Sequence, residues 1–485
     1  MSHHYLLPDI SQPGKIGCSL PHLDVSPAEL PPQELLRQEL ELPEVSEVEL
    51  VRYFTALSKL NYGVDTGFYP LGSCTMKYNP KWHEDMAKLL GFASIHPYQP
   101  EESVQGALQL MFELQEYLAE LTGMHTTSLA PIAGAHGEFA GLLIVKAYHR
   151  DRGDKARKKI LLTDSSHGTN PASVVMCGFD IGVVASDSEG NVDMKSLDSM
   201  MNEEVAALTL TMPTTLGLFD PQIADISQLV HERGGLLGAD GANLNAFLGH
   251  VKFGELGYDY VQLNLHKTFS TPHGGGGPGS GPVCVTESLA GFLPSPLVAK
   301  DNGKYTFASP AKSIGRIGNF YGNFSVMVKA YAYIRSLGAE GLKAVSEDAV
   351  LNANYLKEKL KAYYYLPYDR TCMHEVVFSG KWQKAKGVHT LDIAKRLLDY
   401  GLHPPTVYFP LIVDEALMTE PTETEGKETL DAYIDAMKEI AREADENPEI
   451  LHTAPHNTPV RRLDEVGAAR NPDLRWEMNS QRRKE

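Results

Sequence analysis

Short apolar segments alternate with helical patterns through the middle of the chain. Apolar residues recur at helical spacing from Val104 to Leu118, and a second helix is predicted over residues 139–148. The apolar segments of strand length are residues 126–130, 159–163, 181–185, 206–212, 236–239, 260–265 and 283–286. Strands that alternate with helices in this way predict an α/β fold, with a mainly parallel sheet covered by helices on both faces.

Both ends of the chain depart from this pattern. Residues 1–60 are rich in proline and acidic side chains, so they are expected to cover another surface or to stay loose. After about residue 338 a helix-rich region follows, with strands near residues 375–378 and 406–409. The sequence therefore predicts four parts: an N-terminal extended arm (1–60), a large domain (61–335), a smaller C-terminal α+β domain (336–454) and a polar tail (455–485).

The composition excludes several classes of protein. The 485 residues are 42% hydrophobic and 22% charged, as is usual for a soluble globular protein. A formal net charge of −18 argues against non-specific binding to nucleic acid, because such binding needs a cationic surface. Five scattered cysteines without a Cys-x-x-Cys pair predict neither a disulfide framework nor a zinc site. No apolar run reaches about 18 residues and no signal-type pattern begins the chain, so we expect a cytoplasmic protein without a membrane segment or a bound metal.

Two charged residues are predicted at the ends of buried strands. The segment 260–265 runs into His266 and Lys267 and then into a loop rich in glycine and proline, which places Lys267 where a strand stops. Asp240 follows the segment 236–239 in the same way. The carboxyl ends of strands bind ligands in α/β sheets, and a buried carboxylate needs a cationic partner. The sequence therefore predicts a binding site at this edge of the sheet.

The spacing of Asp240 and Lys267 is typical of pyridoxal phosphate (PLP) enzymes of the aspartate aminotransferase fold type, fold type I. In such a site the lysine amine forms an imine with the cofactor aldehyde, and the carboxylate pairs with the protonated ring nitrogen. A free lysine amine, with a pKa near ~10.4, is neutral in only roughly one molecule in a few thousand at pH 7. An imine at Lys267 would hold the amine in an uncharged, reactive form, and the cofactor ring would explain why Asp240 lies nearby.

At the lysine, the segment at residues 263–282 reads Leu-Asn-Leu-His-Lys-Thr-Phe-Ser-Thr-Pro-His, then four glycines and Pro-Gly-Ser-Gly-Pro. It resembles the cofactor-lysine segment of glycine dehydrogenase (decarboxylating), the P-protein family of the glycine cleavage system. Four further segments resemble motifs of that family: Pro-Leu-Gly-Ser-Cys-Thr-Met-Lys (70–77), Ser-His-Gly-Thr-Asn-Pro-Ala (166–172), Asp-Gly-Ala-Asn (240–243) and Glu-Pro-Thr-Glu-Thr-Glu (420–425). The match covers nearly the whole chain, and the length resembles that of subunit 2 in the split form of the family.

The resemblance implies a fold, an activity and partners. It implies fold type I with PLP on Lys267, decarboxylation of glycine with release of carbon dioxide, and transfer of the aminomethyl group to the lipoyl arm of H-protein. It also implies a partner subunit 1 in an α2β2 assembly. His167 and Lys267 are then the candidate proton-handling groups.

Several residues are candidates for holding the cofactor. Gly134, Ala135 and His136 lie in a turn of small residues that opens a helix, where backbone N–H groups can bind a phosphate. The resemblance implies that His167 stacks on the cofactor ring opposite Asp240. Thr214 is a candidate hydroxyl donor, with turn capping as the equally simple alternative. Asn243 and His266 lie within the matching motifs and are assigned to the cofactor with them.

Candidates for the substrate lie in two glycine-rich segments. By resemblance, Ser73, Thr75 and Lys77 lie near the cofactor or the substrate; without it, their segment reads as a connector between the arm and the large domain. Arg316 is a candidate fork for a phosphate or a carboxylate, although a lone arginine more often forms a surface ion pair. No arginine accompanies the small-domain motifs. That suits a decarboxylase, because clamping a carboxylate stabilises the state that must be destroyed.

Three other interpretations remain open at this point. Another fold type I enzyme, such as an amino-acid decarboxylase or a cysteine desulfurase, would act without a lipoyl protein. A structural partner subunit without cofactor is disfavoured by the presence of Lys267. A dinucleotide-binding protein is disfavoured because the glycine-rich run follows a lysine and opens no helix.

Overall fold

The computed structural model describes residues 6–37, 42–273 and 279–474 of the chain. It divides into two compact units, Met1–Thr66 and Gly67–Glu485, each treated by itself below. The four consecutive glycines after His273 and the last eleven residues of the predicted tail lie outside the described residues. The predicted division into four parts stays a prediction.

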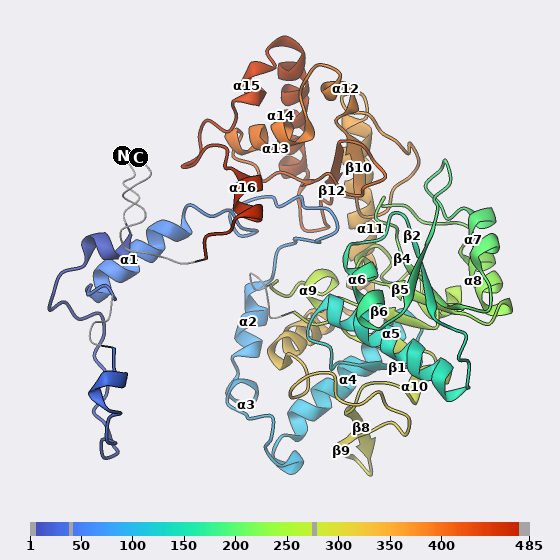
Figure 1. Ribbon diagram of the computed structural model, residues 1–485, viewed down its shortest axis with the longest axis horizontal. Helices are drawn as coiled ribbons and strands as arrows, with labels where there is room; N and C mark the ends of the chain where they lie inside the picture. Colours follow the sequence, from blue (N-terminus) through green and yellow to red (C-terminus); the bar gives the residue numbers. More distant parts are fainter. Residues whose placement is uncertain (1–5, 38–41, 274–278, 475–485) are drawn as a thin grey trace. The chain divides into compact units, whose positions relative to one another are not determined.

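A seven-stranded sheet forms the centre of the second unit (Figure 1). Its strands, in spatial order, are β1 (Thr126–Ser128), β7 (Val283–Val285), β6 (Tyr260–Gln262), β5 (Leu236–Asp240), β4 (Val205–Thr211), β2 (Lys159–Thr163) and β3 (Asp180–Val184). The strands from β6 to β3 are parallel, and β7 runs antiparallel to both of its neighbours. The predicted mainly parallel sheet is confirmed, and the reversal at β7 is a feature that the pattern did not indicate.

Helices cover both faces of this sheet, as predicted. Strand side chains alternate between the faces, so Leu161 of β2 joins one apolar cluster while Ile160 and Leu162 join the other. The first cluster includes residues of α4 (Gln105–Thr122), α8 (Ile223–Glu232) and the start of α11 (Phe324–Leu360). The second includes residues of α5 (Gly134–Asp151) and α6 (Thr169–Met176). Burial on both faces explains why these strands read as nearly continuous apolar runs.

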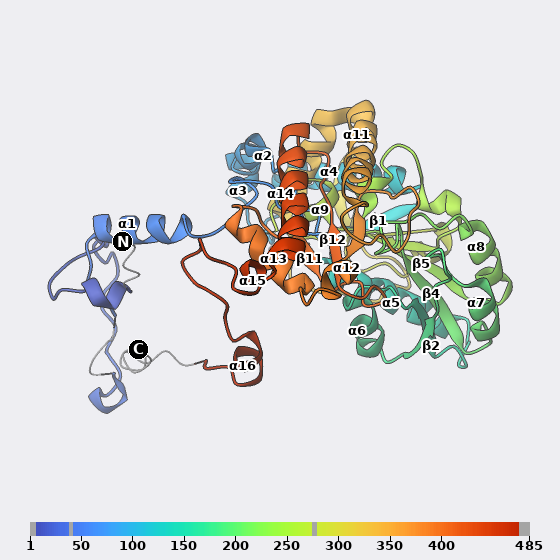
Figure 2. The same cartoon turned by 90° about the horizontal axis from the view of Figure 1, so that it is seen from above.

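A smaller sheet follows α11, which is interrupted at Gly338 with φ +61°. Its strands, in order, are β10 (Val376–Ser379), β12 (Ala416–Thr419) and β11 (Thr406–Val407), all antiparallel. Figure 2 shows the orange and red helices α13 (Thr390–Asp399) and α14 (Lys427–Glu446) beside these strands. The end of α11 packs into the apolar cluster of this region, whereas its start packs against the large sheet. One helix therefore links the two cores.

The remaining elements of this unit are short. They are α2 (Lys81–Ala87), α3 (Leu90–Ala93), α7 (Met194–Met200), α9 (Leu265–Thr268), α10 (Glu287–Ala290), the hairpin β8 (Leu297–Asp301) and β9 (Lys304–Ala308), α12 (Lys381–Lys384), α15 (Glu449–His452) and α16 (Glu465–Arg470). Single 3-10 turns lie at Glu101–Ser103, Leu244–Ala246 and Phe253–Leu256.

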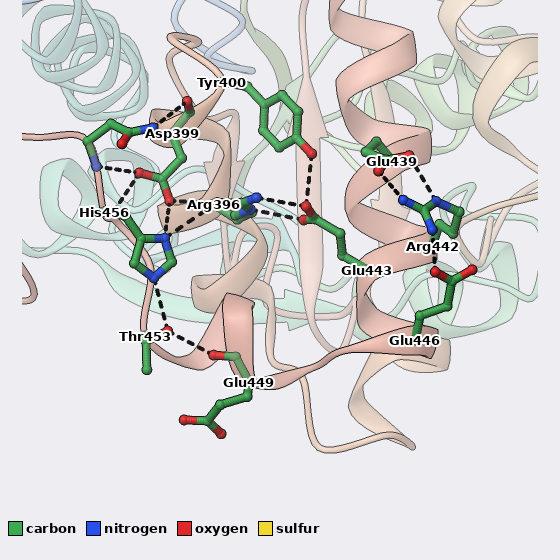
Figure 3. A network of polar contacts seen from close by, with 11 residues as sticks. Arg396, Asp399, Tyr400, Glu439, Arg442, Glu443, Glu446, Glu449, Thr453 and His456 are labelled. Carbon is green, nitrogen blue, oxygen red and sulfur yellow. Dashed lines mark hydrogen bonds and ion pairs between the residues drawn. The ribbon is translucent and has the colours of Figure 1, made fainter.

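Charged side chains join the C-terminal helices (Figure 3). Arg396 of α13 forms a bidentate pair with Glu443 of α14, with Nε–Oε2 and Nη2–Oε1 distances of 2.9 and 2.7 Å. Asp399 accepts hydrogen bonds from Arg396 Nη1 and from the backbone of the segment after α15, and its Oδ2 lies 2.9 Å from His456 Nδ1. Bidentate guanidinium–carboxylate pairs fix orientation as well as distance. This network therefore holds the end of the C-terminal region against α13.

In the first unit, the described residues 6–37 and 42–66 contain one α-helix, α1 (Glu47–Ser58), besides 3-10 turns at Leu7–Ile10 and Gln33–Leu35. A capping box starts α1, because Ser46 and Glu49 satisfy each other's backbone N–H groups. The helix buries none of its residues, in keeping with a segment that lacks a core. Over the described ranges of both units, no helix is at once long enough and apolar enough to cross a lipid bilayer.

Candidate active site

The predicted strand ends meet at one cavity of about 170 Å³. Asp240 is the last residue of β5, and Thr211 is the last residue of the neighbouring β4. The lining residues are Ser73, Gly134, Ala135, Glu138, His167, Thr169, Thr211, Asp240, Ala242, Asn243, Asn264, His266 and Lys267. The structure thus brings together seven residues that the sequence assigned to the cofactor, together with Ser73.

Lys267 lies just past a strand end, although the local structure differs from the prediction. Strand β6 ends at Gln262, and Lys267 belongs to the single helical turn α9 that starts after Asn264. The strand is shorter than predicted because backbone pairing continues past it only as single bonds, from Leu263 N to the Pro282 carbonyl and from Leu265 N to that of Ser280. Lys267 Nζ donates a hydrogen bond of 2.8 Å to the Ser73 carbonyl. The amine therefore faces the cavity.

Asp240 is held by hydrogen bonds that leave its charge unpaired. Its side chain is buried, its Oδ1 accepts from Ala242 N at 3.1 Å, and its Oδ2 accepts from Asn170 Nδ2 at 3.3 Å. Among the residues that the structure describes, no cationic side chain forms an ion pair with it. A buried carboxylate without a cation is costly. The arrangement suits a ligand that brings a protonated nitrogen.

His167 lies in the cavity wall, and its ring is fixed by neighbours. Its Nδ1 is 2.9 Å from Thr169 Oγ1, which in turn donates a hydrogen bond of 2.8 Å to Glu138 Oε1. Glu138 Oε2 accepts from Asn170 Nδ2 at 2.9 Å, so Asn170 bridges Glu138 and Asp240. Burial lowers the pKa of His167. Burial therefore disfavours the charged imidazolium, and the hydrogen bonds fix the position of the ring.

Glu138 and Thr169 are functional candidates that the sequence analysis missed. Burial, and then the negative charge of Asp240, raise the pKa of Glu138 to about 7. Both residues lie within segments singled out by pattern, Glu138 in the first turns of α5 and Thr169 two residues after His167. The sequence does contain a signal for Glu138, because it is an acidic residue just inside a helix that opens with small residues. Only the packing of α5 against α6 puts that acid beside Thr169 and Asn170.

The start of α5, where the sequence predicts a cradle for a phosphate, lines the cavity. Gly134 is its first residue, and a Cβ there would lie 2.6 Å from Asn264 Oδ1, so only glycine fits. Two other lining atoms, Thr211 Oγ1 and Asn243 Oδ1, are buried without a hydrogen-bond partner in the described part of the chain. Buried polar atoms normally have partners. The cradle and these two atoms fit a polar ligand such as PLP.

Five of the predicted residues do not line this cavity: Thr214, His136 and Arg316, and also Thr75 and Lys77, which are described below. Thr214 Oγ1 accepts from the backbone of Leu216 and Leu218, which is the turn-capping alternative. His136 Nδ1 accepts from Ile132 N at 3.3 Å at the helix start. The exposed Arg316 places its guanidinium 5.6 Å from the centre of the Tyr321 ring. Their predicted ligand contacts stay predictions.

The segment after Ser73 is clamped by the C-terminal region. Ser73 and Thr75 have positive φ angles of 64° and 49°, a conformation that side chains other than glycine disfavour. Ser73 N donates to Glu375 at 2.7 Å, and Thr75 N donates to Glu420 at 2.9 Å. These two bonds hold the strained loop so that its carbonyl meets Lys267. Thr75 itself is buried and lies outside the cavity lining.

Glu375 and Glu420 are an unusual pair of buried carboxylates. They flank β10 and β12, whose register sets Val376 opposite Thr419, so the acids lie across from each other, and both are fully buried. Together with His374, they place ligating-type atoms within 4.8 Å of one another, a cluster that the search for cysteine pairs did not indicate. Burial raises the pKa of both carboxyl groups, and the charge of Glu420 raises that of Glu375 further. We interpret them as a pair that shares one proton.

The unequal hydrogen bonding identifies which acid carries that proton. Both oxygens of Glu420 accept hydrogen bonds, from Thr75 N and from Asn245 Nδ2, as an ionised carboxylate would. Glu375 Oε1 has no hydrogen-bond partner among the described residues, which leaves it free to carry a hydrogen. Glu375 is therefore the protonated member.

A pH series tests this assignment. Because the folded-state pKa of Glu420 is raised from 4.5 to about 7, the folded state holds the extra proton more tightly, and stability should fall as the pH rises across that interval. Glu375→Gln, which mimics the protonated acid and leaves Glu420 in place, should change the urea midpoint little and keep this decline. Glu420→Leu should cost about 1–3 kcal/mol for each buried donor left unpaired. Equal effects of the two changes would refute the assignment.

Comparison with known proteins agrees with the geometry. The family model described as glycine cleavage system P-protein matches residues 21–308, and that described as glycine dehydrogenase, C-terminal domain, matches residues 345–459. A relative from Caldanaerobacter subterraneus subsp. tengcongensis, "probable glycine dehydrogenase (decarboxylating) subunit 2", is 61% identical over 98% of this chain and 99% of its own. A relative of the same name from Bacillus velezensis is 57% identical over 97% of each chain.

Solved structures are similar in fold. An inhibitor-bound glycine decarboxylase (P-protein) superposes with a TM-score of 0.71 at 21% identity, covering 84% of this chain and 93% of the other. A glutamate decarboxylase from Lactobacillus brevis superposes with a TM-score of 0.65 at 16% identity, covering 88% and 96%.

The mainly parallel sheet, with Lys267 and Asp240 lining one cavity at its strand ends, defines a fold type I PLP enzyme. The cavity described above, with its cradle and its unpaired acid, fits that cofactor. Within this class the chain belongs to the glycine cleavage system P-protein family. The expected fold class and cofactor are thereby confirmed.

Proposed function

We propose that this chain is subunit 2 of a split P-protein, which releases carbon dioxide from glycine and transfers the aminomethyl group to the lipoyl arm of H-protein. The proposal depends most on one observation: Lys267 and Asp240 line the same cavity in a chain that is 61% identical to a probable glycine dehydrogenase (decarboxylating) subunit 2. The name of that relative supports a partner subunit 1. The α2β2 stoichiometry and H-protein remain our inference from the family.

Four of the lining residues have distinct tasks in this proposal. PLP, when bound, supplies an aldehyde that links to amines and a ring that accepts the electron pair left behind by carbon dioxide. Lys267 would hold the aldehyde, and Ser73, whose carbonyl oxygen accepts from the Lys267 amine, would orient that amine before the cofactor binds. Asp240 would keep the ring nitrogen protonated, which maintains the ring's capacity to accept electrons. His167, in the cavity wall, would move protons at Nε2.

The cavity also explains why decarboxylation is favoured over reactions that keep the carboxylate. None of its lining residues is an arginine, and Lys267 is its one cationic side chain among the described residues. An arginine fork would stabilise the intact carboxylate and raise the barrier to its loss. We infer that glycine is oriented by hydrogen bonds from neutral groups. Ser73, Asn243 and His266 of the cavity lining are the candidates.

An exchange assay tests the proposal. The chain is co-expressed with subunit 1, and incorporation of labelled bicarbonate into glycine is measured with lipoylated H-protein, with unlipoylated H-protein and with neither. We expect exchange that depends on the lipoyl group and a visible absorbance band that borohydride removes. Release of carbon dioxide at the same rate without any lipoyl protein would favour an ordinary amino-acid decarboxylase instead.

A further inference from the structure

One side chain, that of Thr169, connects an acid in the cavity to the imidazole in its wall. Glu138 Oε1 and Thr169 Oγ1 are 2.8 Å apart, and Thr169 Oγ1 is 2.9 Å from His167 Nδ1. A threonine hydroxyl carries a single hydrogen, so it can donate to only one of these neighbours at a time. The proton positions on Glu138 and His167 are therefore linked.

Two arrangements satisfy every group in this row. If Glu138 is protonated, it donates to Thr169, the Thr169 hydroxyl donates to His167 Nδ1, and the imidazole carries its hydrogen on Nε2. If Glu138 is ionised, Thr169 donates to it, and His167 carries its hydrogen on Nδ1. The backbone N–H of Thr169, 3.3 Å from Nδ1, also needs an acceptor there and favours the first arrangement.

The two arrangements present different chemistry to the cavity. His167 lines the cavity, and no hydrogen bond within the described ranges of the chain occupies its Nε2. The first arrangement makes Nε2 a hydrogen-bond donor, and the second makes it an acceptor. The protonation of Glu138 thus determines what a ligand in the cavity meets.

We propose that Glu138, acting through the Thr169 hydroxyl, is a positioning residue that sets the tautomer of His167 and supplies the proton that His167 delivers at Nε2. The proton of Glu138 passes to Thr169 Oγ1, the hydroxyl proton passes to Nδ1, and the Nε2 proton leaves to an acceptor in the cavity. Glu138 ends ionised and His167 ends neutral with its hydrogen on Nδ1. A proton taken up from water at Nε2 then runs the row in reverse: the Nδ1 hydrogen returns to Thr169 Oγ1, and the Thr169 hydroxyl proton returns to Glu138.

The identity of the group that accepts the Nε2 proton of His167 rests on the proposed function. When the aminomethyl carbon bonds to one sulfur of a disulfide, the S–S bond breaks and the other sulfur leaves as a thiolate. Glycine and the disulfide therefore consume one proton for each carbon dioxide released. The row from Glu138 to His167 provides that proton.

The surroundings of Glu138 suit a group that gains and loses a proton near neutral pH. Burial and the charge of Asp240 favour the protonated acid, whereas Thr169, Asn170 and the charge of Lys267 favour the ionised one, which leaves its pKa at about 7. His266, also in the cavity, adds no charge, because burial lowers its pKa to about 3.

Three substitutions separate the proton row from mere packing. Glu138→Gln keeps the shape, since its amide nitrogen can donate to Thr169 and its oxygen can accept from Asn170, but it cannot release a proton. Thr169→Val keeps the volume and removes the hydroxyl that links the two ends. Thr169→Ser restores that hydroxyl and is the control for rescue.

The first readout is the tautomer of His167 in the full-length chain without added cofactor. Ring-nitrogen NMR of histidine-labelled protein, with the signal assigned through His167→Asn, reports which nitrogen carries the hydrogen. From about pH 6 to pH 8 we expect the native chain to move from the Nε2–H to the Nδ1–H form. Glu138→Gln should remain in the Nε2–H form throughout. Identical titrations of the native chain and this variant would overturn the proposal.

The second readout is catalysis by the assembled enzyme. Thr169→Val and Glu138→Gln should each lower the transfer rate to lipoylated H-protein by about 10- to 100-fold and remove the pH dependence near 7, in the range expected for losing a proton donor. Thr169→Ser should stay close to the native rate. An unchanged pH profile in Thr169→Val would overturn the proposal. A tautomer shift seen in an enzyme that fails to act on glycine would instead refute the proposed function.

Discussion

Replacing Lys267 by alanine should reduce glycine-dependent exchange to background, at least about 10⁴-fold below the native rate, because the cofactor supplies most of the barrier lowering. The amine of Lys267 is the nucleophile that we propose to hold the aldehyde, and no other lysine lines the cavity as described. The visible absorbance band of the purified complex should disappear at the same time.

Two controls separate the nucleophile from its charge. Lys267→Arg keeps a cation and a donor for the Ser73 carbonyl, which Lys267 Nζ contacts at 2.8 Å, yet guanidinium does not bond to an aldehyde as an amine does. We therefore expect the same loss of exchange as for alanine. Lys88→Ala, at an exposed position, should leave both absorbance and exchange unchanged. Full exchange in Lys267→Ala would remove the basis of the proposed function.

Replacing Lys77 by methionine should lower the free energy of unfolding by about 3–5 kcal/mol, the usual cost of breaking one partner of a buried ion pair. Lys77 Nζ lies 2.5 Å from Glu423 Oε1 and 3.0 Å from Tyr333 OH, and its side chain is only 1% exposed. Burial alone would lower the pKa of Lys77, but the Glu423 carboxylate reverses that effect and raises it. The ion pair is therefore intact across the neutral range.

The matched control removes both charges. Lys77→Met combined with Glu423→Leu leaves no buried charge unpaired, so most of the lost stability should return. Thermal and urea unfolding of the native chain and of the two variants measure this. If Lys77→Met unfolds like the native chain but raises the KM for glycine, then Lys77 contacts the substrate, as the sequence analysis predicted, and the structural interpretation is wrong.

Much of the fold was predictable because it depends on local pattern. The strand β2 was predicted with its observed bounds, and the strands that end at Asp240 and before Lys267 were predicted within a few residues. Buried parallel strands read as apolar runs, and polar residues that end them mark the ligand edge. The sequence alone was therefore enough to assign Lys267 and Asp240 to the same site.

What the sequence could not supply were contacts between distant segments. Glu375 and Glu420 face each other because of the antiparallel register of β10 and β12, and β12 itself is a four-residue apolar run that pattern did not single out. Glu138 reads as an ordinary residue near a helix start until α5 packs against α6. Lys77 was assigned to the ligand by its motif, whereas its partner Glu423 lies in another motif far along the chain.

Ser73 gives its carbonyl oxygen to Lys267 and its backbone N–H to Glu375, so a single residue joins three regions that are far apart in the sequence. An excised piece spanning only the seven-stranded sheet would keep the lysine and the acid but lose the contact that aims the amine.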